Sequence, residues 1–433
     1  MTKILKVFAR QVLDSRGNPT VEAEVTTSRG RFLAIVPSGA STGEREAIEI
    51  RDGGEGYHGK SVNEAIKNVR EVIGPEICGM DATKQKEIDQ VMIDLDGTKT
   101  KSALGANAIL SVSMAVCRAG AAVEGIPLYK YLARLSGRRG VTLPVMQLNV
   151  MNGGKHAGLE DDIQEQMILP VRAETYSEAL RMGVETYLAL KGILKKRFGA
   201  FGILVGDEGG FVPKVEGVEE RLEYMTQAIE EMGYSDRLFL GLDAASSEFH
   251  REGKYHLYGN EYDSGDLVEF YAGIVSKYEI VSLEDGMSEN DWHGWTELMS
   301  KLGNKINVVG DDLLVTNVEY IRRAVAEKCC DTLLLKLNQI GTVTEAIEAA
   351  NLSFKSGWKV IVSHRSGESE DTFIADLAVG LDAGQCKFGG PSRSERNCKY
   401  NQLLRIEEEL NDEGRYAGAG PFKIRGACQN SVS

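Results

Sequence analysis

The sequence predicts an α/β protein in which a large barrel domain follows a smaller N-terminal α+β domain. Residues 3–36 alternate apolar and polar side chains in the manner of strands, and helical periodicity follows them. Beyond residue 140 the pattern becomes apolar strand, loop and amphipathic helix, repeated over about 290 residues, which suits a single α/β barrel. A doubly wound sheet is the alternative, but no glycine-rich dinucleotide fingerprint follows the first strand. The segment SGRRG is the expected linker, so we place the domains at 1–137 and 138–433.

The N-terminal segment predicts an antiparallel meander of strands accompanied by helices. Strand-like alternation runs through KVFARQVLDS, TVEAEVTT and RFLAIVP, and the turn sequences RGNPT and SRGR separate them. Helical periodicity then marks residues 62–73, 82–93 and 107–123. The third helix is the most apolar, but it is short for a membrane span and contains Arg118. We therefore expect it to lie in the protein core, and we expect no membrane span.

The barrel segment predicts buried strands that alternate with amphipathic helices. The predicted strands are ILVGDEGG, FLGLDAA, IVSLEDG, INVVGDD, LLLKLNQ, VIVSHRS and QCKFGG, within residues 203–390. The predicted helices are EERLEYMTQAIEEM, GDLVEFYAGIVSKY, NVEYIRRAVAEK and TVTEAIEAANLSFKSG, within residues 219–357. Each strand–helix unit takes about 30 residues, so equivalent strand ends recur at that interval.

Composition restricts the partners that the chain can bind. A net charge of −14 without a basic stripe disfavours nucleic acid. An anionic substrate would therefore need positive charge gathered in its site, for example as a metal ion. Seven cysteines without CxxC spacing fit free thiols in a reducing cytosol, and MTKILKVFAR lacks the apolar run of a secretory signal. We expect a cytoplasmic protein and leave open a secondary pool that is secreted or at the cell surface.

Ionisable residues stand at the carboxyl ends of the predicted barrel strands. Asp243, Glu284 and Asp311 end three consecutive strands, and Lys336 and Lys387 end later ones. The carboxyl ends of barrel strands converge on one face, where active sites are built. Three adjacent carboxylates repel one another unless a cation lies among them, and ligands that are all oxygen favour a hard ion such as Mg²⁺. One acid at a strand end is more often a helix N-cap, but three in succession favour a metal site.

Lys336 is unusual because it lies in the most apolar stretch of the chain, LLLKLNQIGT. Strand alternation places Leu334, Lys336 and Asn338 on one face, which we expect to be the barrel interior. Burial lowers the pKa of a lysine, and a second ammonium such as that of Lys387 lowers it further. A lysine that is neutral near pH 7 can act as a general base. The alternative is a structural ion pair between Lys336 and Asp311.

Two further segments suggest a site for an anion. His364, Arg365 and Ser366 follow a predicted strand and form a compact anion receptor, because arginine binds phosphate oxygens through two parallel hydrogen bonds. PSGASTG, at residues 37–43, has the hydroxyl groups and glycines of a lid that can close over a ligand. Either segment alone would be weak evidence.

Two glycine-rich loops add candidate acids and a histidine. NGGKHAG brings His156, and Gln164 and Glu165 follow it along the chain. GDEGG places Asp207 and Glu208 on a tight turn. A lone histidine is more often structural than catalytic, so these residues gain weight only together.

These segments together resemble the enolase family. The resemblance runs in order over nearly the whole chain, through DSRGNPTVE, PSGASTGEREA, LGANAILSVSMA, NGGKHAG, GDEGGF, GLDAASSEF, SLEDG, GDDLLVTN, LLLKLNQIGT, VSHRSGESEDT and SRSERNCKYNQLLRIEEEL. It implies a small N-terminal α+β domain packed on a modified (β/α)8 barrel whose first strands are partly antiparallel. It also implies the glycolytic and gluconeogenic dehydration of 2-phosphoglycerate to phosphoenolpyruvate, a reversible reaction with two Mg²⁺ ions.

The resemblance further implies a role for each matched residue. Lys336 resembles the base that removes the C2 proton, and Glu208 resembles the acid that protonates the leaving C3 hydroxyl, with Glu165 raising its pKa. Ser41, in the lid, resembles a ligand of the second metal ion. The residues that resemble ligands of the first ion are Asp243, Glu284 and Asp311, and those that resemble substrate contacts are His156, Gln164, Glu165, Lys387 and, on the phosphate, Arg365 and Ser366.

Some positions depart from the usual family pattern. Gln166 follows QE where phenylalanine is typical, Gly286 follows LED where proline is common, and Phe388 and Gly390 replace the usual small residues after the lysine. None of these changes removes a charged catalytic group, but they alter the packing expected beside the catalytic acid and lysine.

Two other functions and the oligomeric state complete the expectations. A racemase or sugar-acid dehydratase of the same superfamily needs no phosphate receptor, so the arginine–serine pair and the lid favour enolase. A non-catalytic surface-binding role is less consistent with a complete set of acid, base and metal ligands, although it could accompany the activity. The family resemblance implies a homodimer or a homo-octamer, and no segment decides between them.

Overall fold

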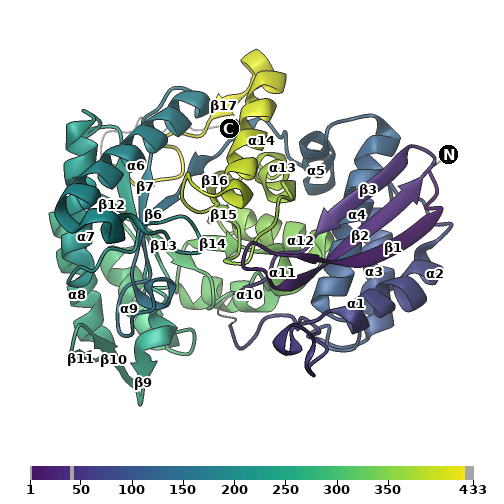
Figure 1. Cartoon of the computed structure of the whole chain (residues 1–433), viewed down its shortest axis with the longest axis horizontal. Coiled ribbons are helices and arrows are strands. Elements are labelled where there is room, and N and C mark those ends of the chain that lie inside the picture. Colours follow the sequence, from purple (N-terminus) through teal and green to yellow (C-terminus); the bar gives the residue numbers. More distant parts are fainter. Residues whose placement is uncertain (1, 40–42, 425–433) are drawn as a thin grey trace.

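The computed structural model describes residues 2–39 and 43–424, which form two domains side by side (Figure 1). The purple and blue part is the N-terminal domain, and the teal to yellow part is the barrel. The first sheet is antiparallel in the order β1-β2-β3, with strands at Lys6–Leu13, Pro19–Thr27 and Gly30–Ile35. The predicted meander is therefore confirmed.

The helices of this domain pack beside the sheet, and α4 (Ala106–Glu124) lies against β2 and β3. Among the described residues α4 is the one helix long and apolar enough to cross a membrane, but 83% of its apolar window is buried inside the fold. It is a core helix, as predicted. The other helices here are η1 (Gly56–Gly59), α1 (Asn63–Lys67), the π-helical η2 (Asn68–Ile73), α2 (Gly74–Ile77), α3 (Gln85–Asp96) and α5 (Leu128–Ser136).

The barrel is a nine-stranded sheet in the order β5-β16-β15-β14-β13-β12-β8-β7-β6. Its edge strands, β5 (Val145–Met146) and β6 (Leu148–Asn152), are consecutive in the chain, and Gln147 between them donates its N–H to the carbonyl of Cys386 in β16. The two edges are thus one nearly continuous segment, and the sheet closes on itself. The remaining strands are β7 (Glu165–Leu169), β8 (Phe239–Asp243), β12 (Ile280–Glu284), β13 (Asn307–Gly310), β14 (Thr332–Leu335), β15 (Lys359–Ser363) and β16 (Gly384–Lys387).

The start of the barrel is antiparallel, and the rest is parallel. Strand β7 pairs antiparallel with both β6 and β8, whereas β8 to β16 pair in parallel, as does β5 with β16. The modified barrel implied by the family resemblance is confirmed. Because β6 and β7 form a hairpin, their connection lies at the same end of the barrel as the carboxyl ends of the parallel strands.

Helices surround the barrel, and the four predicted ones are confirmed in α7, α8, α10 and α12 (Figure 1). Side-chain caps begin several of them: Asp263, Asn317 and Thr342 each accept a backbone N–H from the first turn. The helices are α6 (Tyr176–Phe198), α7 (Gly217–Glu231), α8 (Ser264–Lys277), α9 (Trp292–Leu302), α10 (Val318–Glu327), α11 (Leu337–Ile340), α12 (Val343–Lys355), α13 (Phe373–Gly380) and α14 (Ser394–Leu410).

Short elements complete the fold. A three-stranded arm projects from the barrel, and a two-stranded sheet joins β4 to β17. The short elements are β4 (Thr142–Leu143), η3 (Gly154–Ala157), η4 (Gly199–Ile203), η5 (Ser246–Phe249), β9 (His250–Arg251), β10 (Lys254–Leu257), β11 (Asn260–Tyr262), η6 (Asn411–Glu413) and β17 (Arg415–Tyr416).

Two predicted strands differ from the structure. ILVGDEGG is not a strand, because the chain turns back on itself where the N–H of Gly206 donates to the carbonyl of Gly210. LLLKLNQ is a strand only as far as Leu335, after which α11 forms a short helical turn that contains Asn338. The alternation prediction therefore fails for Asn338, although it holds before that residue.

Alternation along β14 separates two apolar environments. Leu334 packs with Val309 and Ile361 in a small cluster inside the barrel. Leu333 and Leu335 belong to the main core between the sheet and its helices. Lys336 follows Leu334 by two residues and lies on the same interior side. Its side chain is therefore at the open end of the barrel.

Candidate active site

The acids predicted at the strand ends lie at one end of the barrel. Asp243 and Glu284 are the last residues of β8 and β12, and Asp311 directly follows β13. These three strands are neighbours in the sheet, and all three side chains are buried. From β16, the Nζ of Lys387 donates to Asp243 Oδ2 and to Glu284 Oε2, each at 2.8 Å. Asp243, Asp311 and Lys387 line one cavity, and Glu284 is joined to it through Lys387.

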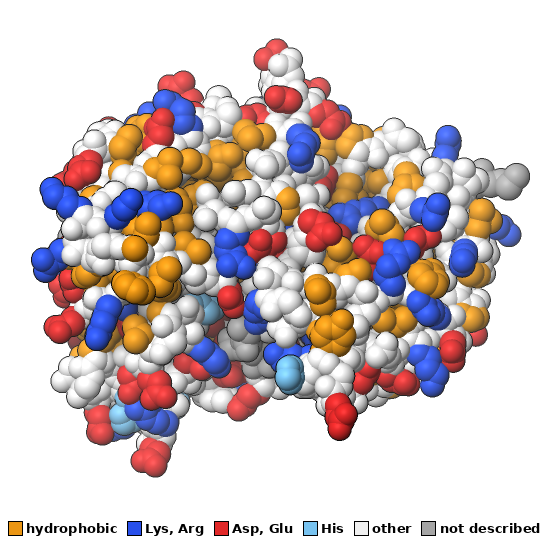
Figure 2. Space-filling view, in the orientation of Figure 1, with side chains coloured by type: hydrophobic (Ala, Val, Ile, Leu, Met, Phe, Trp, Pro, Cys, Tyr) orange, Lys and Arg blue, Asp and Glu red, His pale blue; other side chains and the backbone are white. Residues whose placement is uncertain are grey.

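The buried charges perturb one another. Burial raises the pKa of Glu284 well above its ordinary value, and the charge of Asp243 raises it further. Burial alone would lower the pKa of Lys387, but its carboxylate neighbours raise it well above the ordinary value. These carboxylates therefore favour the charged form of Lys387. Acidic and basic side chains are interspersed on the outer face shown in Figure 2, whereas carboxylates outnumber cations in the lining of the cavity.

Lys336 stands one residue beyond β14, with its side chain 14% exposed, and its Nζ donates to Asp311 Oδ2. Burial lowers the pKa of Lys336, but Asp311 more than reverses this effect and the pKa lies above its ordinary value. The prediction of a lowered pKa is therefore wrong for this arrangement, because the charge of Asp311 outweighs burial and Lys387. The ion pair considered as the alternative is present.

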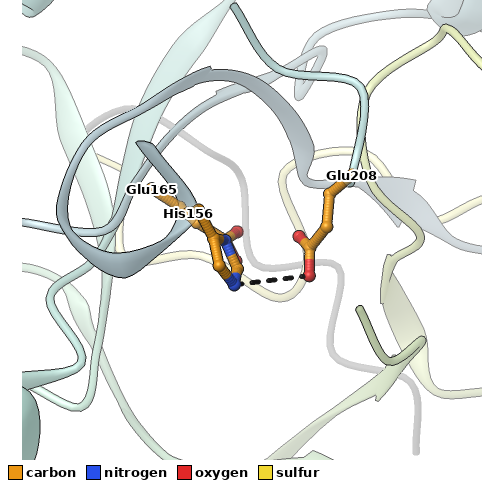
Figure 3. Close-up of side chains that lie close together, drawn as sticks. All are labelled: His156, Glu165 and Glu208. Atoms are coloured by element: carbon orange, nitrogen blue, oxygen red, sulfur yellow. Dashed lines mark ion pairs between the residues drawn. The ribbon is translucent and has the colours of Figure 1, made fainter. Parts of the chain in front are cut away.

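His156, Glu165 and Glu208 meet although they come from separate segments (Figure 3). His156 belongs to η3, Glu165 begins β7, and Glu208 lies in the turn before α7. His156 Nδ1 is 3.5 Å from Glu165 Oε1, and His156 Nε2 is 3.9 Å from Glu208 Oε1. Gln164 is buried and lines the same cavity. The structure thus brings together the residues that the two glycine-rich loops predicted.

The two glutamates of this group hold their protons differently. Burial raises the pKa of Glu165 well above its ordinary value, and the charge of Glu208 raises it further. Burial acts on Glu208 in the same direction. Its neighbours His364, His156 and Arg396 outweigh burial, however, so the pKa of that carboxyl lies well below its ordinary value. The prediction that Glu165 keeps Glu208 protonated is wrong, because the groups that favour an anion surround Glu208.

Arg396 explains why Glu208 receives a hydrogen bond. The Nη1 of Arg396, on α14, lies 2.7 Å from His364 Nδ1, and a guanidinium can only donate. His364 Nδ1 therefore carries no proton, and its Nε2–H faces Glu208 Oε2 at 3.3 Å. Burial lowers the pKa of His364 to about 4, so the imidazole is neutral. A neutral donor of fixed tautomer thus faces the Glu208 carboxylate.

Arg365 and Ser366 lie at the site, but both already have partners. Arg365 Nη1 donates to Glu46 Oε2 at 2.8 Å, and Nη2 donates to Glu46 Oε1 at 3.2 Å. The Ser366 hydroxyl donates to Glu208 Oε1 at 3.2 Å. The predicted two-nitrogen contact of Arg365 is therefore made to a carboxylate of the N-terminal domain rather than left open for an anion.

The predicted lid lies beside this pair. Ser41 falls outside the described residues. On one side of it, Ser38 exchanges two backbone hydrogen bonds with Gly367, at 2.8 and 2.9 Å. On the other side, the N–H of Gly43 donates to Glu46 Oε1 at 3.1 Å. Both ends of the lid are thus attached next to the Arg365 loop.

Carboxylates of the described residues form two groups that could hold a metal ion. Three ligand atoms lie within 4.8 Å of one another in His156–Glu165–Glu208 and in Asp285–Asp311–Asp312. The predicted set Asp243, Glu284 and Asp311 is not such a group, and Lys387 and Lys336 pair with its members. The set still fits a hard cation: its donors are buried oxygens, and Glu284 Oε1 has no hydrogen-bond partner.

Four residues at the site were not predicted: Asp285, Asp312, Arg396 and Glu46. Asp285 accepts the N–H groups of Asp311 at 2.9 Å and of Asp312 at 3.0 Å, which ties two strand ends together. Both acids directly follow predicted metal ligands in LEDG and GDD, and that doubling was an available signal. Arg396 and Glu46 lie in the segments SRSERN and TGEREA. Their partners are distant in sequence, so the local sequence carried no signal.

The departures from the family pattern are accommodated by packing. Gln166 is buried, and its amide donates to the carbonyl of Ile163 at 3.0 Å. Phe388 is fully buried against Tyr400, with ring centroids 5.9 Å apart. A Cβ on Gly286 would lie 2.8 Å from Leu298 Cδ2, so a glycine fits closely there. Lys387 keeps its place beside the carboxylates.

Comparison with known proteins agrees with this geometry. The family model described as enolase, C-terminal TIM barrel domain, matches residues 140–424, and that of the enolase N-terminal domain matches residues 4–132. A protein of Thermococcus gammatolerans named enolase is 54% identical over 420 residues, which cover 96% of this chain and 97% of that protein. Enolases of Thermococcus kodakarensis and Solanum lycopersicum are each 53% identical, over 420 and 435 residues, and cover 96% and 97% of this chain and 97% and 98% of their own.

Proposed function

The chain belongs to the enolase family and is a hydro-lyase with enolase activity, and from this premise we propose how its own residues divide the reaction. The substrate of the family is a small molecule, 2-phosphoglycerate, which loses water to give phosphoenolpyruvate. The observation that carries the proposal is the placement of a lysine and a glutamate, Lys336 and Glu208, in one cavity lined by buried carboxylates.

A divalent cation is implied by the family, and we propose two Mg²⁺ ions per site. Asp243, Glu284 and Asp311 would hold the first, and Ser41 would contribute to the second. When bound, such ions stabilise the negative charge that develops on the substrate carboxylate after the C2 proton is removed. A Lys or His base with one or two Mg²⁺ ions is the general pattern of the enolase superfamily.

Lys336 is the proposed base. Burial, Arg365 and Lys387 lower its pKa, whereas Asp311 and Glu284 raise it. The two acids that raise the pKa are among the proposed metal ligands, so their charge is no longer available to hold a proton on Lys336 once they bind a cation. An amine buried beside two other cations then accepts a carbon-bound proton. Lys387 is the proposed partner of the substrate carboxylate.

Glu208 is the proposed acid for the leaving hydroxyl. It is ionised in the structure, while the adjacent Glu165 has the raised pKa. The two carboxyls are close enough to share a proton. We propose that Glu165 gives its proton to Glu208 when the substrate binds. His156 lies between them and is placed to transfer or hold that proton.

Arg365 and Ser366 are the proposed phosphate contacts. Phosphate binding would take the guanidinium from Glu46, which lies next to the lid in the N-terminal domain. The exchange of partners links substrate binding to the lid. A superfamily racemase or sugar-acid dehydratase would not need these groups, and an additional surface-binding role would not use them.

The proposal is tested by mixing the purified protein with 2-phosphoglycerate and Mg²⁺. We expect an ultraviolet absorbance band of the enol phosphate product to appear. The band should not form when a chelator is present from the start. A folded protein that forms no product would contradict the assignment. In a parallel assay a sugar acid replaces 2-phosphoglycerate. Racemisation or dehydration of that sugar acid, without turnover of 2-phosphoglycerate, would favour the other superfamily chemistry.

We also propose a cytoplasmic homo-oligomer, a dimer or an octamer. Large apolar side chains on α6 and in the following segment are exposed, including Leu188, Phe201, Leu204 and Val205, with Phe201 81% exposed. Exposed apolar surface of this kind is typical of protein interfaces. The described cysteines are free, which fits a reducing compartment.

A further inference from the structure

A buried arginine that the proposed mechanism does not use holds the loop of His156 from behind. Arg221, on α7, is 0% exposed, and its two terminal nitrogens donate to the two oxygens of Asp162. Asp162 lies between β6 and β7, in the segment that we call the His156 loop, residues 153–163. The hydroxyl of Tyr258 also donates to Asp162 Oδ1, at 2.7 Å. The carboxylate therefore has a full set of donors on the side away from the cavity.

The space around this ion pair leaves the loop little freedom. A Cβ on Gly153 would lie 2.5 Å from Asp162 Oδ2 and 2.6 Å from Arg221 Nη1. The N–H of Gly153 donates to the carbonyl of Gln164 at 2.9 Å, which closes the base of the loop. The next residue begins η3, which carries His156. A short rigid link thus connects the ion pair to the imidazole.

Two other ion pairs hold the outer side of the loop, but they are exposed. Lys155 Nζ lies 3.0 Å from Glu248 Oε1, and Arg251 Nη1 lies 2.6 Å from Asp161 Oδ1. Exposed pairs contribute little because water and salt screen them. A buried arginine–carboxylate fork is stronger and fixes direction as well as distance. The buried pair is therefore the contact that sets the position of the loop.

The charge of the loop makes this contact necessary. Residues 160–162 are Glu, Asp and Asp, and the same loop carries His156 into a cavity that already holds several carboxylates. Three consecutive acids beside such a site repel it and one another. Arg221 neutralises the charge of Asp162 inside the protein, where water does not solvate it.

We propose that Arg221 and Asp162 are positioning residues that assemble the His156 loop in its substrate-binding arrangement before the substrate arrives. The inference rests on the proposed function, because it treats His156 as a substrate contact. If the loop were less often in this arrangement, the apparent affinity for substrate would fall in proportion to the fraction assembled. Bound substrate would restore the arrangement, so turnover at saturation would change little.

The test compares Arg221→Lys with the wild type and with Tyr258→Phe. Lysine keeps the charge but loses the two-nitrogen fork. We expect the KM for 2-phosphoglycerate to rise about ten-fold in Arg221→Lys and about three-fold in Tyr258→Phe, with kcat changed by less than about two-fold. Amide hydrogen exchange in residues 153–163 should quicken in the free variants and return towards the wild-type rate with substrate.

Arg118→Lys is the matched control. Arg118 makes the same fork to Asp371, at 2.6 and 2.8 Å, and among the described residues neither side chain has a hydrogen bond to the His156 loop. We expect a comparable loss of thermal stability in Arg118→Lys with an unchanged KM. An unchanged KM in Arg221→Lys, a fall in kcat alone, or an equal rise of KM in Arg118→Lys would overturn the proposal. A wild type that does not turn over 2-phosphoglycerate would instead contradict the proposed function.

Discussion

Lys336 and Glu208 approach the cavity from different strands and loops, and their separate substitution distinguishes their roles. Lys336→Ala removes the proposed base, so exchange of the C2 hydrogen of 2-phosphoglycerate with solvent should fall by about 10²–10⁴-fold. Glu208→Gln should keep this exchange and lose dehydration, because the amide cannot donate a proton as an acid does. Proton magnetic resonance in D₂O measures exchange, and absorbance measures dehydration. Equal loss of exchange in both variants would contradict the assignment.

A second residue-scale prediction concerns Asp376, which is buried on α13 and accepts a hydrogen bond from Gln402 at 3.2 Å. Burial raises the pKa of Asp376 from 3.8 to about 7, although Arg118 opposes the rise. Between these values the folded protein holds a proton that the unfolded chain releases, so the free energy of unfolding falls as the pH rises.

Asp376→Asn should remove that dependence, since an amide does not ionise. We expect the variant to be more stable than the wild type at pH 8 by on the order of 3 kcal/mol, and the difference to shrink towards pH 4. Urea denaturation at several pH values measures it. A wild type and a variant with the same pH slope would show that Asp376 ionises normally.

At this scale the sequence predicted which side chains meet but not where their protons lie. Residues at strand ends converge in any barrel, so Asp243, Glu284 and Lys387 could be placed from their spacing. Protonation depends on the nearest neighbours instead. His364 lowers the pKa of Glu208 most among its neighbours, and Arg396 fixes the tautomer of that histidine. Nothing in the local sequence indicates that these residues are neighbours.

At the scale of elements, the turn that carries Glu208 depends on close contact with β6. A Cβ on Gly210 would lie 1.9 Å from Asn152 Oδ1 and 2.8 Å from Asn149 Oδ1. Gly210→Ala should therefore push the turn and Glu208 away from the cavity. We expect kcat to fall by about 10²-fold or more, because misplacement of about 1 Å can have that effect.

Gly192→Ala is the control for this prediction. Gly192 is exposed within α6, and nothing lies within 4 Å of an added Cβ. The variant should keep full activity and gain about 0.5–1 kcal/mol of stability, because alanine favours a helix. Circular dichroism on heating and the absorbance assay test both variants. Full activity in Gly210→Ala would show that the turn can relax.

The prediction of secondary structure succeeded for long segments with a regular helical period. It failed where a short turn interrupts an apolar segment. Helices α7, α8, α10 and α12 have clear amphipathic periods, and the structure contains all four. ILVGDEGG has the apolar start of a strand, but its glycines let the chain reverse. In LLLKLNQ the apolar run before Lys336 suggested that the strand continues, but Asn338 and Gln339 after it are polar and lie in the helical turn of α11, which contacts α4 and α12.

At the scale of the whole molecule, the buried acids at the barrel end predict a dependence on metal. Chelation should abolish activity, and added Mg²⁺ should restore it. A ligand that binds only the folded protein stabilises it, by about 2.7 kcal/mol at one hundred times its Kd. The thermal midpoint should therefore rise with the Mg²⁺ concentration. An unchanged midpoint and full activity in chelator would contradict a divalent cation.

The exposed apolar side chains predict self-association. Leu204→Asp places a charge on a half-exposed apolar position that no described contact needs, so the oligomer should dissociate in dilute solution while the fold remains. Light scattering after size-exclusion chromatography measures the mass. A monomeric wild type, or a variant that assembles as the wild type does, would show that this surface is not the interface.

The hairpin between β6 and β7 has a consequence for how the site can move. In a regular barrel each strand supplies its own loop, and each loop shifts on its own. Here one connection carries His156 and Gln164 and leads directly into Glu165, the first residue of β7. Glu165 is held by its pairing with both neighbouring strands, whereas His156 lies on the connection itself. A displacement of the connection would therefore change the spacing between the histidine and the glutamate without moving the strand.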